Sequence, residues 1–372
     1  MTDIFIYGTL RHQPLLDIVA GQPVKVRPAT LRDHKVVSVL NEDYPICLAE
    51  AGSLAEGGIV TLEGEALERV SWYEEAFGYH LWPGMAHTPE GEEAAVSVYL
   101  PSNADDAGDR PWSLEDWARA WAQAARMSAR ECMTYFGRVP AQQMGWRYDQ
   151  VRARALSRMR AAEQPAPTLG RERRADQVEL LSDEVTHAEF YITKRQTLRH
   201  PLYSGGMTET LVRETFIAPD ASLVLPYDPV KDTVLLVEQF RMGPYNNGSP
   251  WPWSLEPVAG RIDPGESPED CARREAMEES GLELDQLLHV TSFYPTPGCC
   301  SEFMHCYIGL TTLPDEGGTG FGLAGEGEDI RTHILPFDRV MELVSSKEAD
   351  CGPLILLMFW LQRERSLLRA AA

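Results

Sequence analysis

Basic residues are scarce in this sequence. Its 372 residues include 34 Lys and Arg against 56 Asp and Glu, which gives a formal net charge of −22. Because nucleic acid and anionic membranes repel such a charge, we expect neither as a partner. Long apolar runs are also lacking, since the longest, Leu354–Leu361, falls far short of the ~20 residues that cross a bilayer. The first residues have no basic start or apolar stretch of the kind found in signal peptides.

Cysteines with the spacing of a metal site or a disulfide framework are missing as well. The seven cysteines are odd in number, scattered, and never arranged as C-x-x-C. This pattern excludes a zinc ribbon and favours reduced, buried thiols. Together with the absent leader, it predicts a cytoplasmic protein.

The composition that is present is that of a globular protein, with 44% hydrophobic and 24% charged residues. A chain of this length predicts two domains. The segment 161–176, AAEQPAPTLGRERRAD, is rich in Pro, Ala and charge and has no apolar period. It predicts a linker between domains at 1–160 and 177–372.

Both domains mix helical and strand patterns, so we expect an α+β fold in each. In the first domain the predicted strands are 3–10, 35–40, 58–62 and 94–100, followed by a helix at 113–135 that begins with the capping sequence Ser-Leu-Glu-Asp. In the second domain the predicted strands are 189–193, 210–216, 222–226, 233–239, 290–294 and 304–309. The predicted helices there are 268–280, 336–346 and 352–369.

The helix at 268–280 carries a cluster of carboxylates. Ser267 is a good N-cap, Pro268 fits the first helical position, and Gly281 can adopt the left-handed C-cap conformation. Glu275 and Glu279 are four residues apart and so project from one face, and Glu278 lies one turn from Glu275. A solvated acidic face is one interpretation of such a charge run. The other is an oxygen-rich site for Mg²⁺, with the glycines before the helix allowing close approach of the backbone.

The spacing of these residues resembles the Nudix box of the Nudix hydrolases: Gly, five residues, Glu, seven residues, then Arg-Glu-apolar-x-Glu-Glu-x-Gly-apolar. The matching positions are Gly260, Glu266, Arg274, Glu275, Ala276, Glu278, Glu279, Gly281 and Leu282. The resemblance implies a Nudix α/β/α sandwich with an N-terminal β-sheet subdomain. It also implies metal-dependent hydrolysis of a nucleoside diphosphate joined to another group.

Four further segments are similar to the ADP-ribose pyrophosphatase subgroup of that family: LLVEQFRMGPY (235–245), LEPVAG (255–260), TPGCCSE (296–302) and GLAGEGEDI (322–330). The resemblance implies hydrolysis of ADP-ribose, a small-molecule nucleotide sugar, to AMP and ribose 5-phosphate. ADP-glucose and GDP-mannose stay open as substrates.

The same resemblance implies roles for individual residues. Mg²⁺, with Mn²⁺ as a substitute, would be bound by the Ala259 carbonyl, Glu275, Glu279 and Glu328, and Glu326 would be the general base. Glu266 and Arg274 would brace the box. Phe190 would stack on the adenine, and Arg213 from the partner subunit of a homodimer formed by the Nudix domain would cover its other face. Arg241 would contact the diphosphate or the terminal ribose.

The start of the chain is similar to a different family. IFIYGTL at 4–10 and Glu74 in VSWYEEAFGYH resemble the γ-glutamylcyclotransferase-like (AIG2-like) family. The resemblance implies a small β-barrel with helices, in which Tyr7, Gly8, Thr9 and Leu10 offer backbone groups to a substrate carboxylate. Glu74 would take the proton of the substrate α-amine. Because Val70-Ser71 replaces the usual Leu-Asp and Glu75 is a neighbouring competitor, a working cyclotransferase and a non-catalytic amine-ligand module both stay open.

Two other hypotheses about the function of the whole chain stay open beside a nucleotide-sugar hydrolase. One is a cyclotransferase whose Nudix half only senses a nucleotide, and the other is a protein in which both halves only bind ligands. The intact residues Glu275, Glu279, Glu326 and Glu328 argue against the nucleotide sensor. Of the 56 acidic residues, nine lie in residues 260–285 and five in residues 314–329. Charge gathered at a metal site does not exclude a diphosphate, and it predicts that substrate binding depends on metal.

Overall fold

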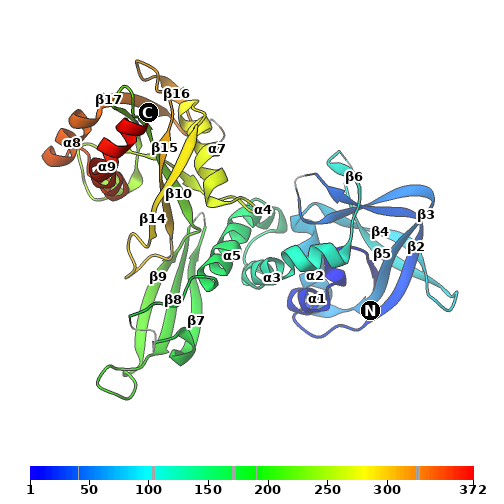
Figure 1. Cartoon of the computed structure of the whole chain (residues 1–372). Coiled ribbons are helices and arrows are strands. Elements are labelled where there is room, and N and C mark those ends of the chain that lie inside the picture. Colours follow the sequence, from blue (N-terminus) through cyan, green and yellow to red (C-terminus); the bar gives the residue numbers. More distant parts are fainter. Residues whose placement is uncertain (41, 103–104, 170–172, 190, 324, 326) are drawn as a thin grey trace. The chain divides into compact units, whose positions relative to one another are not determined.

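The structure, a computed structural model, describes residues 1–40, 42–102, 105–169, 173–189, 191–323, 325 and 327–372 (Figure 1). The chain divides into two compact units, Met1–Gln164 and Pro165–Ala372. The division falls inside the predicted linker segment, although the last helix of the first unit continues to Ala162.

The first unit begins with strands and ends with helices. Its elements are β1 (Thr2–Ile6), η1 (Thr9–Arg11), α1 (Gln13–Ala20), β2 (Val26–Val39), β3 (Pro45–Leu62), α2 (Gly64–Ala76), β4 (Tyr79–His87), β5 (Glu93–Pro101), β6 (Ala107–Pro111), α3 (Leu114–Cys132), α4 (Ala141–Gly145) and α5 (Tyr148–Ala162). Ser113 caps α3 by accepting a hydrogen bond from the Asp116 N–H at 3.2 Å, as the capping sequence predicts.

The strands of the first unit close into a small barrel. They run in the order β3-β1-β5-β4-β2-β6, and a further pairing of β3 with β2 closes the ring. The central strand β1 pairs antiparallel with β3 and parallel with β5. Its apolar residues Ile4, Phe5 and Ile6 are buried, so β1 belongs to the core. The predicted barrel is confirmed.

The second unit has two sheets and three long helices among its described residues. Its elements are η2 (Ala175–Gln177), β7 (Glu179–Ala188), β8 (Ile192–Arg199), β9 (Leu211–Ile217), β10 (Ala221–Asp228), β11 (Thr233–Phe240), α6 (Met242–Asn246), β12 (Trp253–Glu256), β13 (Val258–Arg261), α7 (Pro268–Ser280), β14 (Gln286–Phe293), β15 (Met304–Leu310), β16 (Thr319–Phe321), β17 (Ile330–Pro336), α8 (Phe337–Ser346) and α9 (Gly352–Ala371).

The larger sheet of the second unit lies between two layers of helices. Its strands run β14-β15-β10-β11-β17-β16, with β12 added on β11 and β13 on β10. Alternate residues of β10 face opposite layers: Leu223 and Leu225 belong to the core formed with α8 and α9, whereas Val224 belongs to the core with α7. The predicted α/β/α sandwich is confirmed.

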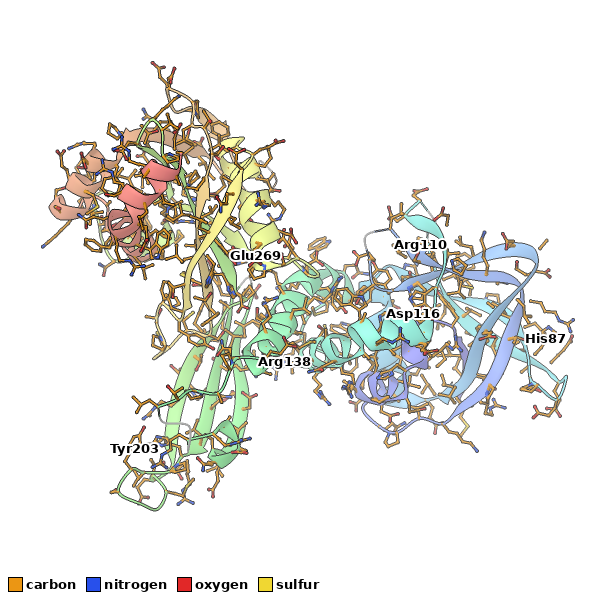
Figure 2. All side chains as sticks on the ribbon, in the orientation of Figure 1. His87, Arg110, Asp116, Arg138, Tyr203 and Glu269 are labelled. Carbon is orange, nitrogen blue, oxygen red and sulfur yellow. The ribbon has the colours of Figure 1, made fainter. Side chains whose placement is uncertain are left out.

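The smaller sheet, in the order β7-β8-β9, is the predicted N-terminal subdomain. The β8–β9 hairpin extends to a loop that carries the exposed Tyr203 (Figure 2). The predicted strand at 189–193 overlaps β8 only at Ile192 and Thr193, because β7 ends at Ala188 and its antiparallel neighbour β8 begins at Ile192. Among the described residues, no helix is both long and apolar enough to cross a membrane.

Candidate functional site

Helix α7 carries the carboxylates of the second unit, and its ends are fixed by its own sequence. The Ser267 hydroxyl accepts the Asp270 N–H at 3.1 Å, and Pro268 occupies the first turn. Gly281 ends the helix with φ of 68°, a conformation that glycine adopts without steric cost. Its first turn carries Glu269 (Figure 2), whose negative charge is stabilised there by the helix dipole.

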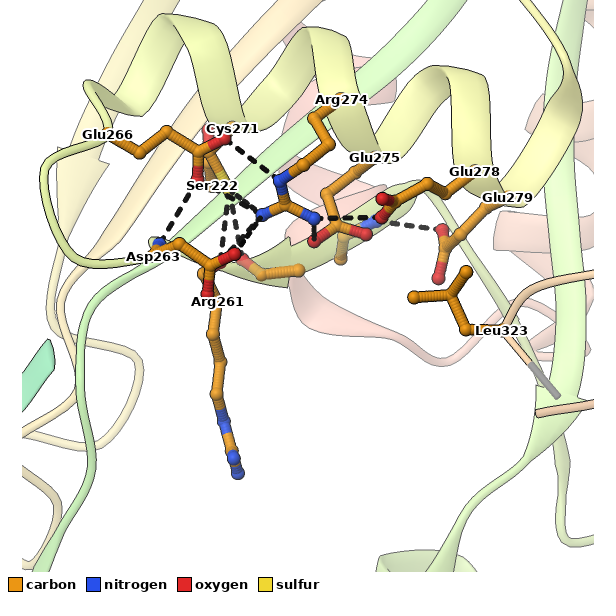
Figure 3. Close-up of polar contacts among 12 residues, drawn as sticks. Ser222, Arg261, Asp263, Glu266, Cys271, Arg274, Glu275, Glu278, Glu279 and Leu323 are labelled. Carbon is orange, nitrogen blue, oxygen red and sulfur yellow. Dashed lines mark hydrogen bonds and ion pairs between the residues drawn. The ribbon is translucent and has the colours of Figure 1, made fainter. Parts of the chain in front are cut away.

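Arg274 joins three carboxylates of this segment through its guanidinium group (Figure 3). Its Nε and Nη2 donate to the two oxygens of Glu266 at 2.9 and 3.0 Å. Its Nη1 donates to Glu275 at 2.7 Å and to Glu278 at 2.8 Å. A planar fork of donors holds carboxylates in fixed positions, so Arg274 orders the loop before α7 and the acidic face of the helix together.

Glu279 is buried at the sheet side of α7, with 2% of its surface exposed. Its Oε2 accepts the Ala259 N–H at 3.1 Å, and the Gln239 side chain lies 3.5 Å from its Oε1. Burial raises the pKa of Glu279 to about 8, and the charges of Glu275 and Glu328 raise it further. The carboxyl group is therefore held next to the Ala259 backbone in a site that favours its neutral form.

Glu275 lies against the backbone of Gly260. A Cβ at position 260 would come 1.7 Å from Glu275 Oε1, so only glycine leaves room for this carboxylate. Burial raises the pKa of Glu275 to about 7, and the charges of Glu278 and Glu328 add to the effect although Arg274 opposes it. The box glycine thus has a steric role in placing the glutamate.

Glu328 comes from the segment after β16, far along the chain from α7. Its Oε2 accepts the Leu323 N–H at 3.0 Å. Because its charge acts on both Glu275 and Glu279, the fold brings three of the predicted metal ligands within electrostatic reach of one another. Within the described ranges, no three His, Cys, Asp or Glu side chains converge as a finished metal cage. Glu275 is instead held by Arg274.

Arg241 follows β11 and was predicted to contact the substrate. In the structure its guanidinium forms a fork with Glu256, with Nε 3.0 Å from Oε1 and Nη2 2.7 Å from Oε2. Its positive charge also lowers the pKa of Glu279, against the larger effect of burial. Arg241 therefore lies beside the carboxylate cluster with its orientation set by Glu256.

Glu302 and Arg261 lie near this cluster, and the sequence reasoning did not identify either. Burial raises the pKa of Glu302, whereas the charges of Arg261 and Arg241 lower it and that of Asp220 raises it. The signal in the sequence was a single acidic residue at the end of TPGCCSE. Glu302 therefore lies within electrostatic reach of Arg261 and Arg241.

Three predicted substrate or catalytic residues remain, namely Phe190, Glu326 and Arg213. Phe190 and Glu326 lie outside the described residues. Tyr191, the next aromatic residue, is 4.9 Å from the Phe216 ring, and the Arg261 guanidinium lies 5.8 Å from its centroid. Arg213 is exposed on β9, and its Nη1 donates to the Val212 carbonyl at 2.9 Å.

The first unit has a cavity at the point where β1 ends. Tyr7, Gly8, Thr9 and Leu10 line it together with Glu74 from α2, so the fold brings the two parts of the predicted N-terminal site together. Most of the remaining wall is aromatic, with contributions from Tyr44, Phe77, Tyr79 and Tyr148. A Cβ on Gly8 would come 3.1 Å from the Pro45 ring, which explains why a small residue follows Tyr7.

Glu74 lies in this cavity without a hydrogen-bond or ion-pair partner among the described side chains. Burial raises the pKa of Glu74 to about 7, and burial is the whole cause of the shift. A carboxyl group with such a pKa exchanges protons readily near neutral pH, as a general base or acid must. The cavity can therefore support proton transfer to or from an enclosed ligand.

The two units thus define two classes of protein domain. The second unit, with its sheet between helices and its carboxylate-bearing helix, matches the NUDIX domain over residues 218–350. The first unit matches "Gamma-glutamyl cyclotransferase, AIG2-like" over residues 4–119.

Curated relatives match about half of the chain. ADP-ribose pyrophosphatase of Escherichia coli (strain K12) is 38% identical over 192 residues, covering 52% of this chain and 91% of the relative. ADP-ribose pyrophosphatase of Haemophilus influenzae is 35% identical over 189 residues, covering 50% and 86%. GDP-mannose pyrophosphatase of Salmonella choleraesuis is 32% identical over 185 residues, covering 50% and 95%. The chain belongs to the Nudix hydrolase family through its second unit, and its first unit is similar to the AIG2-like family.

Proposed function

We propose that the second unit hydrolyses ADP-ribose to AMP and ribose 5-phosphate in a reaction that depends on Mg²⁺. The observation that carries the proposal is the electrostatic coupling of Glu275, Glu279 and Glu328 beside the Ala259–Gly260 backbone. Similarity to two ADP-ribose pyrophosphatases supports the choice of substrate.

The donor set fits a hard divalent cation. Carboxylate and carbonyl oxygens are the ligands that Mg²⁺ and Mn²⁺ take. The charge of Glu328 raises the pKa of both Glu275 and Glu279, and a bound cation would offset this repulsion. The residues that would hold the ion are Glu275, Glu279, Glu328 and the Ala259 carbonyl. A bound cation would supply the charge that offsets a diphosphate and would lower the pKa of a water molecule.

The chain's own residues then orient the substrate and move the proton. Arg241, fixed by Glu256, supplies a guanidinium for the diphosphate or the terminal ribose. Glu326 is the general base in this proposal, and Phe190 with Arg213 of a partner subunit would hold the adenine, all three from the sequence resemblance. Arg274 keeps Glu266, Glu275 and Glu278 in place, and so acts through them.

A substrate panel tests this proposal. We expect the purified full chain with Mg²⁺ to hydrolyse ADP-ribose with a higher kcat/KM than ADP-glucose or GDP-mannose, and EDTA to abolish the activity. A higher kcat/KM for GDP-mannose would change the substrate and keep the reaction class. Failure to turn over any nucleoside diphosphate sugar, combined with tight binding of one, would instead support a nucleotide sensor.

For the first unit we propose a γ-glutamyl cyclotransferase that uses Glu74. This carboxyl group, which has no partner among the described side chains, lines the same cavity as the Tyr7–Leu10 turn. The substrate α-amino nitrogen forms a bond to its own side-chain carbonyl carbon, and the bond from that carbon to the leaving amine breaks. The proton lost by the attacking nitrogen passes through Glu74 to the departing amine, giving 5-oxoproline and the free amine.

Release of 5-oxoproline from γ-glutamyl amides tests the role of Glu74. We expect Glu74→Gln to abolish release, and Glu75→Gln, the matched control at a residue that does not line the cavity, to retain it. Release that survives Glu74→Gln would remove Glu74 from the reaction. Ligand binding without any release would indicate an amine-ligand module.

We also propose that the second unit forms a homodimer. Apolar side chains are exposed around β7 and β9, including Leu180, Leu181 and Val212, each more than half exposed in a single chain. Light scattering after gel filtration tests the dimer, and a mass of one chain at micromolar concentration would contradict it.

For the location of the protein we propose the cytoplasm. All seven cysteines are free thiols, as expected in a reducing compartment.

A further inference from the structure

Two adjacent cysteines, Cys299 and Cys300, lie in the loop between β14 and β15, beside the end of β9 (Figure 1). The structure describes all seven cysteines of the chain, and of these only Cys299 is exposed. Cys300 is partly buried, and burial raises the pKa of its thiol, with the charge of Glu302 adding to the effect. An exposed thiol with a second thiol beside it is typical of redox-sensitive cysteines.

Backbone hydrogen bonds join this loop to β9. The Phe216 N–H donates to the Cys299 carbonyl at 2.8 Å, and the Ser301 N–H donates to the Phe216 carbonyl at 3.0 Å. The Phe216 ring packs against the Tyr191 ring at 4.9 Å between centroids. Three residues before Phe216, β9 carries Arg213, which is proposed above to cover the adenine in a partner subunit. The two cysteines are therefore attached to a strand that carries a proposed substrate residue.

The same loop also contacts the charged groups near the carboxylate cluster. The Cys300 Sγ accepts the Glu302 N–H at 3.5 Å. Burial raises the pKa of Glu302, and the charges of Arg261 and Arg241 oppose this rise, so Glu302 lies within electrostatic reach of Arg241. Arg241 is the residue proposed to contact the diphosphate or the terminal ribose. A backbone change at the two cysteines would therefore displace Glu302 as well as the end of β9.

A disulfide between adjacent residues requires such a backbone change. Consecutive Cα atoms are about 3.8 Å apart across a trans peptide bond, whereas the Cα atoms of a disulfide are usually about 4.4–6.8 Å apart. In the observed loop the N–H groups of Cys299 and Cys300 both donate to the Thr296 carbonyl, at 3.1 and 3.0 Å, and this arrangement would have to deform. Strain makes a disulfide easier to reduce, which suits a reversible modification in a reducing compartment.

We propose that Cys299 and Cys300 form a modification site for hydrogen peroxide, and that the disulfide formed there lowers nucleotide-sugar hydrolysis by the second unit. The effect on activity rests on the hydrolase function proposed above for that unit. The two cysteines do not touch the reacting atoms in this proposal. They act through the positions of β9 and Glu302.

The modification takes two steps. The sulfur of the exposed Cys299 attacks one oxygen of the peroxide, so that an S–O bond forms, the O–O bond breaks and the departing hydroxide leaves as water with the thiol proton. The sulfur of Cys300 then attacks the sulfur of this sulfenic acid, so that the S–S bond forms, the S–O bond breaks and a second water leaves with the Cys300 proton. The two thiols together lose two hydrogens, and hydrogen peroxide is reduced to two water molecules.

Peptide mass and enzyme activity test the proposal on the full chain. Chymotryptic cleavage after Phe293 and Phe303 releases Tyr294–Phe303, which contains Cys299 and Cys300 and no other cysteine. After hydrogen peroxide and then alkylation of the remaining thiols, we expect this peptide to be unalkylated and lighter by two hydrogens. We expect kcat/KM for ADP-ribose to fall about 10-fold, because small displacements of groups that position a substrate have large effects, and to recover with dithiothreitol.

The two measurements separate the modification from the hydrolase function. Two alkylated thiols in this peptide after peroxide treatment would overturn the proposal and leave the hydrolase function standing. A disulfide with unchanged kcat/KM would overturn the effect on activity. If the reduced chain hydrolyses no nucleotide sugar, the hydrolase function and the effect on activity are both wrong, and the peptide mass alone decides whether the modification site exists.

Variants locate the effect. Cys299→Ser removes the exposed thiol, so after peroxide treatment we expect its kcat/KM to stay within about 2-fold of its own untreated value. Cys351→Ser is the matched control, because it removes another thiol of the second unit at the N-cap of α9, where serine is favourable. Peroxide should inactivate this control like the wild type. Equal inactivation of Cys299→Ser, or protection by Cys351→Ser, would contradict control by the two adjacent cysteines.

Discussion

Glu74 in the first unit and Glu275 in the second both have a pKa of about 7, but for different reasons. Burial alone raises the pKa of Glu74, in a cavity lined mainly by aromatic rings. At Glu275 burial is also the largest cause, but the charges of Glu278 and Glu328 add to it and Arg274 opposes it. Glu74 and Glu275 therefore have the same pKa in two different electrostatic environments.

The difference teaches what each site requires of a ligand. A carboxyl group isolated among aromatic rings can hold and release a proton without further charge, which suits proton transfer within an organic substrate. Carboxyl groups that lie close together repel one another, and a bound cation offsets this repulsion. Such a site suits an anionic substrate that binds together with a metal ion. Metal removal should therefore abolish the activity proposed for the second unit and leave the activity proposed for the first unit unchanged.

The largest effect should come from Glu279→Gln. Because Glu279 is buried and coupled to two other carboxyl groups, we expect a loss of about 1000-fold or more in kcat for nucleotide-sugar hydrolysis, with 5-oxoproline release unchanged. Steady-state assays of both activities on one preparation measure this. Glu283→Gln, at an exposed residue just past α7, is the control and should stay within about 2-fold. A similar loss in the control would show that the site does not depend on specific carboxylates.

Glu74→Gln should change the pH dependence of stability. Glu74 keeps its proton to about pH 7 in the folded state but loses it near 4.5, its ordinary value, when unfolded. The free energy of unfolding of the wild type should therefore fall as pH rises from about 5 to 8, by about 3 kcal/mol from this group. The neutral glutamine lacks this loss, so the variant should be the more stable protein at pH 8.

Denaturant unfolding of wild type and variant at pH 5 and pH 8 measures the difference, and Glu75→Gln is the control. If the free energy of unfolding changes equally with pH in wild type and in Glu74→Gln, then burial does not raise the pKa of Glu74, and the proposed contrast with Glu275 is wrong.

Gly260→Ala tests how the coupled group is assembled. A methyl group at this position would overlap Glu275 Oε1, so the carboxylate or the backbone must move. We expect a loss of about 100-fold in kcat/KM for nucleotide-sugar hydrolysis, because small displacements at a reacting centre have large effects. Gly352→Ala is the control, since a Cβ there meets nothing within 4 Å. Activity near the wild-type level in Gly260→Ala would mean that the position of Glu275 is not important.

The smallest effect should come from Arg274→Lys, which retains the charge but loses the fork of donors. Lysine cannot bind Glu266, Glu275 and Glu278 together in the observed geometry, so we expect a loss of about 10-fold, mostly in kcat. A rise in KM for Mg²⁺ would show that Arg274 acts by placing carboxylates. Arg273→Lys is the control, because Arg273 instead donates to the Leu284 carbonyl.

Parts of the fold follow directly from the sequence. The predicted helix at 268–280 has the bounds of α7, because its N-cap, first-turn proline and C-cap glycine act locally. The start of α3 at Ser113 was predicted for the same reason. The predicted strands at 35–40 and 58–62 are fragments of β2 and β3, whose full length depends on pairing around the barrel. Helices α2 and α5, which carry Glu74 and Tyr148, were missed.

The sequence by itself determined the limits of α7 and the spacing of its carboxylates, because these depend on residues close together in the chain. It also carried the resemblance to the two families. Tertiary structure alone decided the rest. It placed Glu328 within reach of Glu275 and Glu279, held Arg241 on Glu256, and enclosed Glu74 in a cavity that α5 completes. Burial and charge coupling depend on what the fold packs around a group, so the pKa values that suit these glutamates to their proposed roles could not be obtained from the sequence.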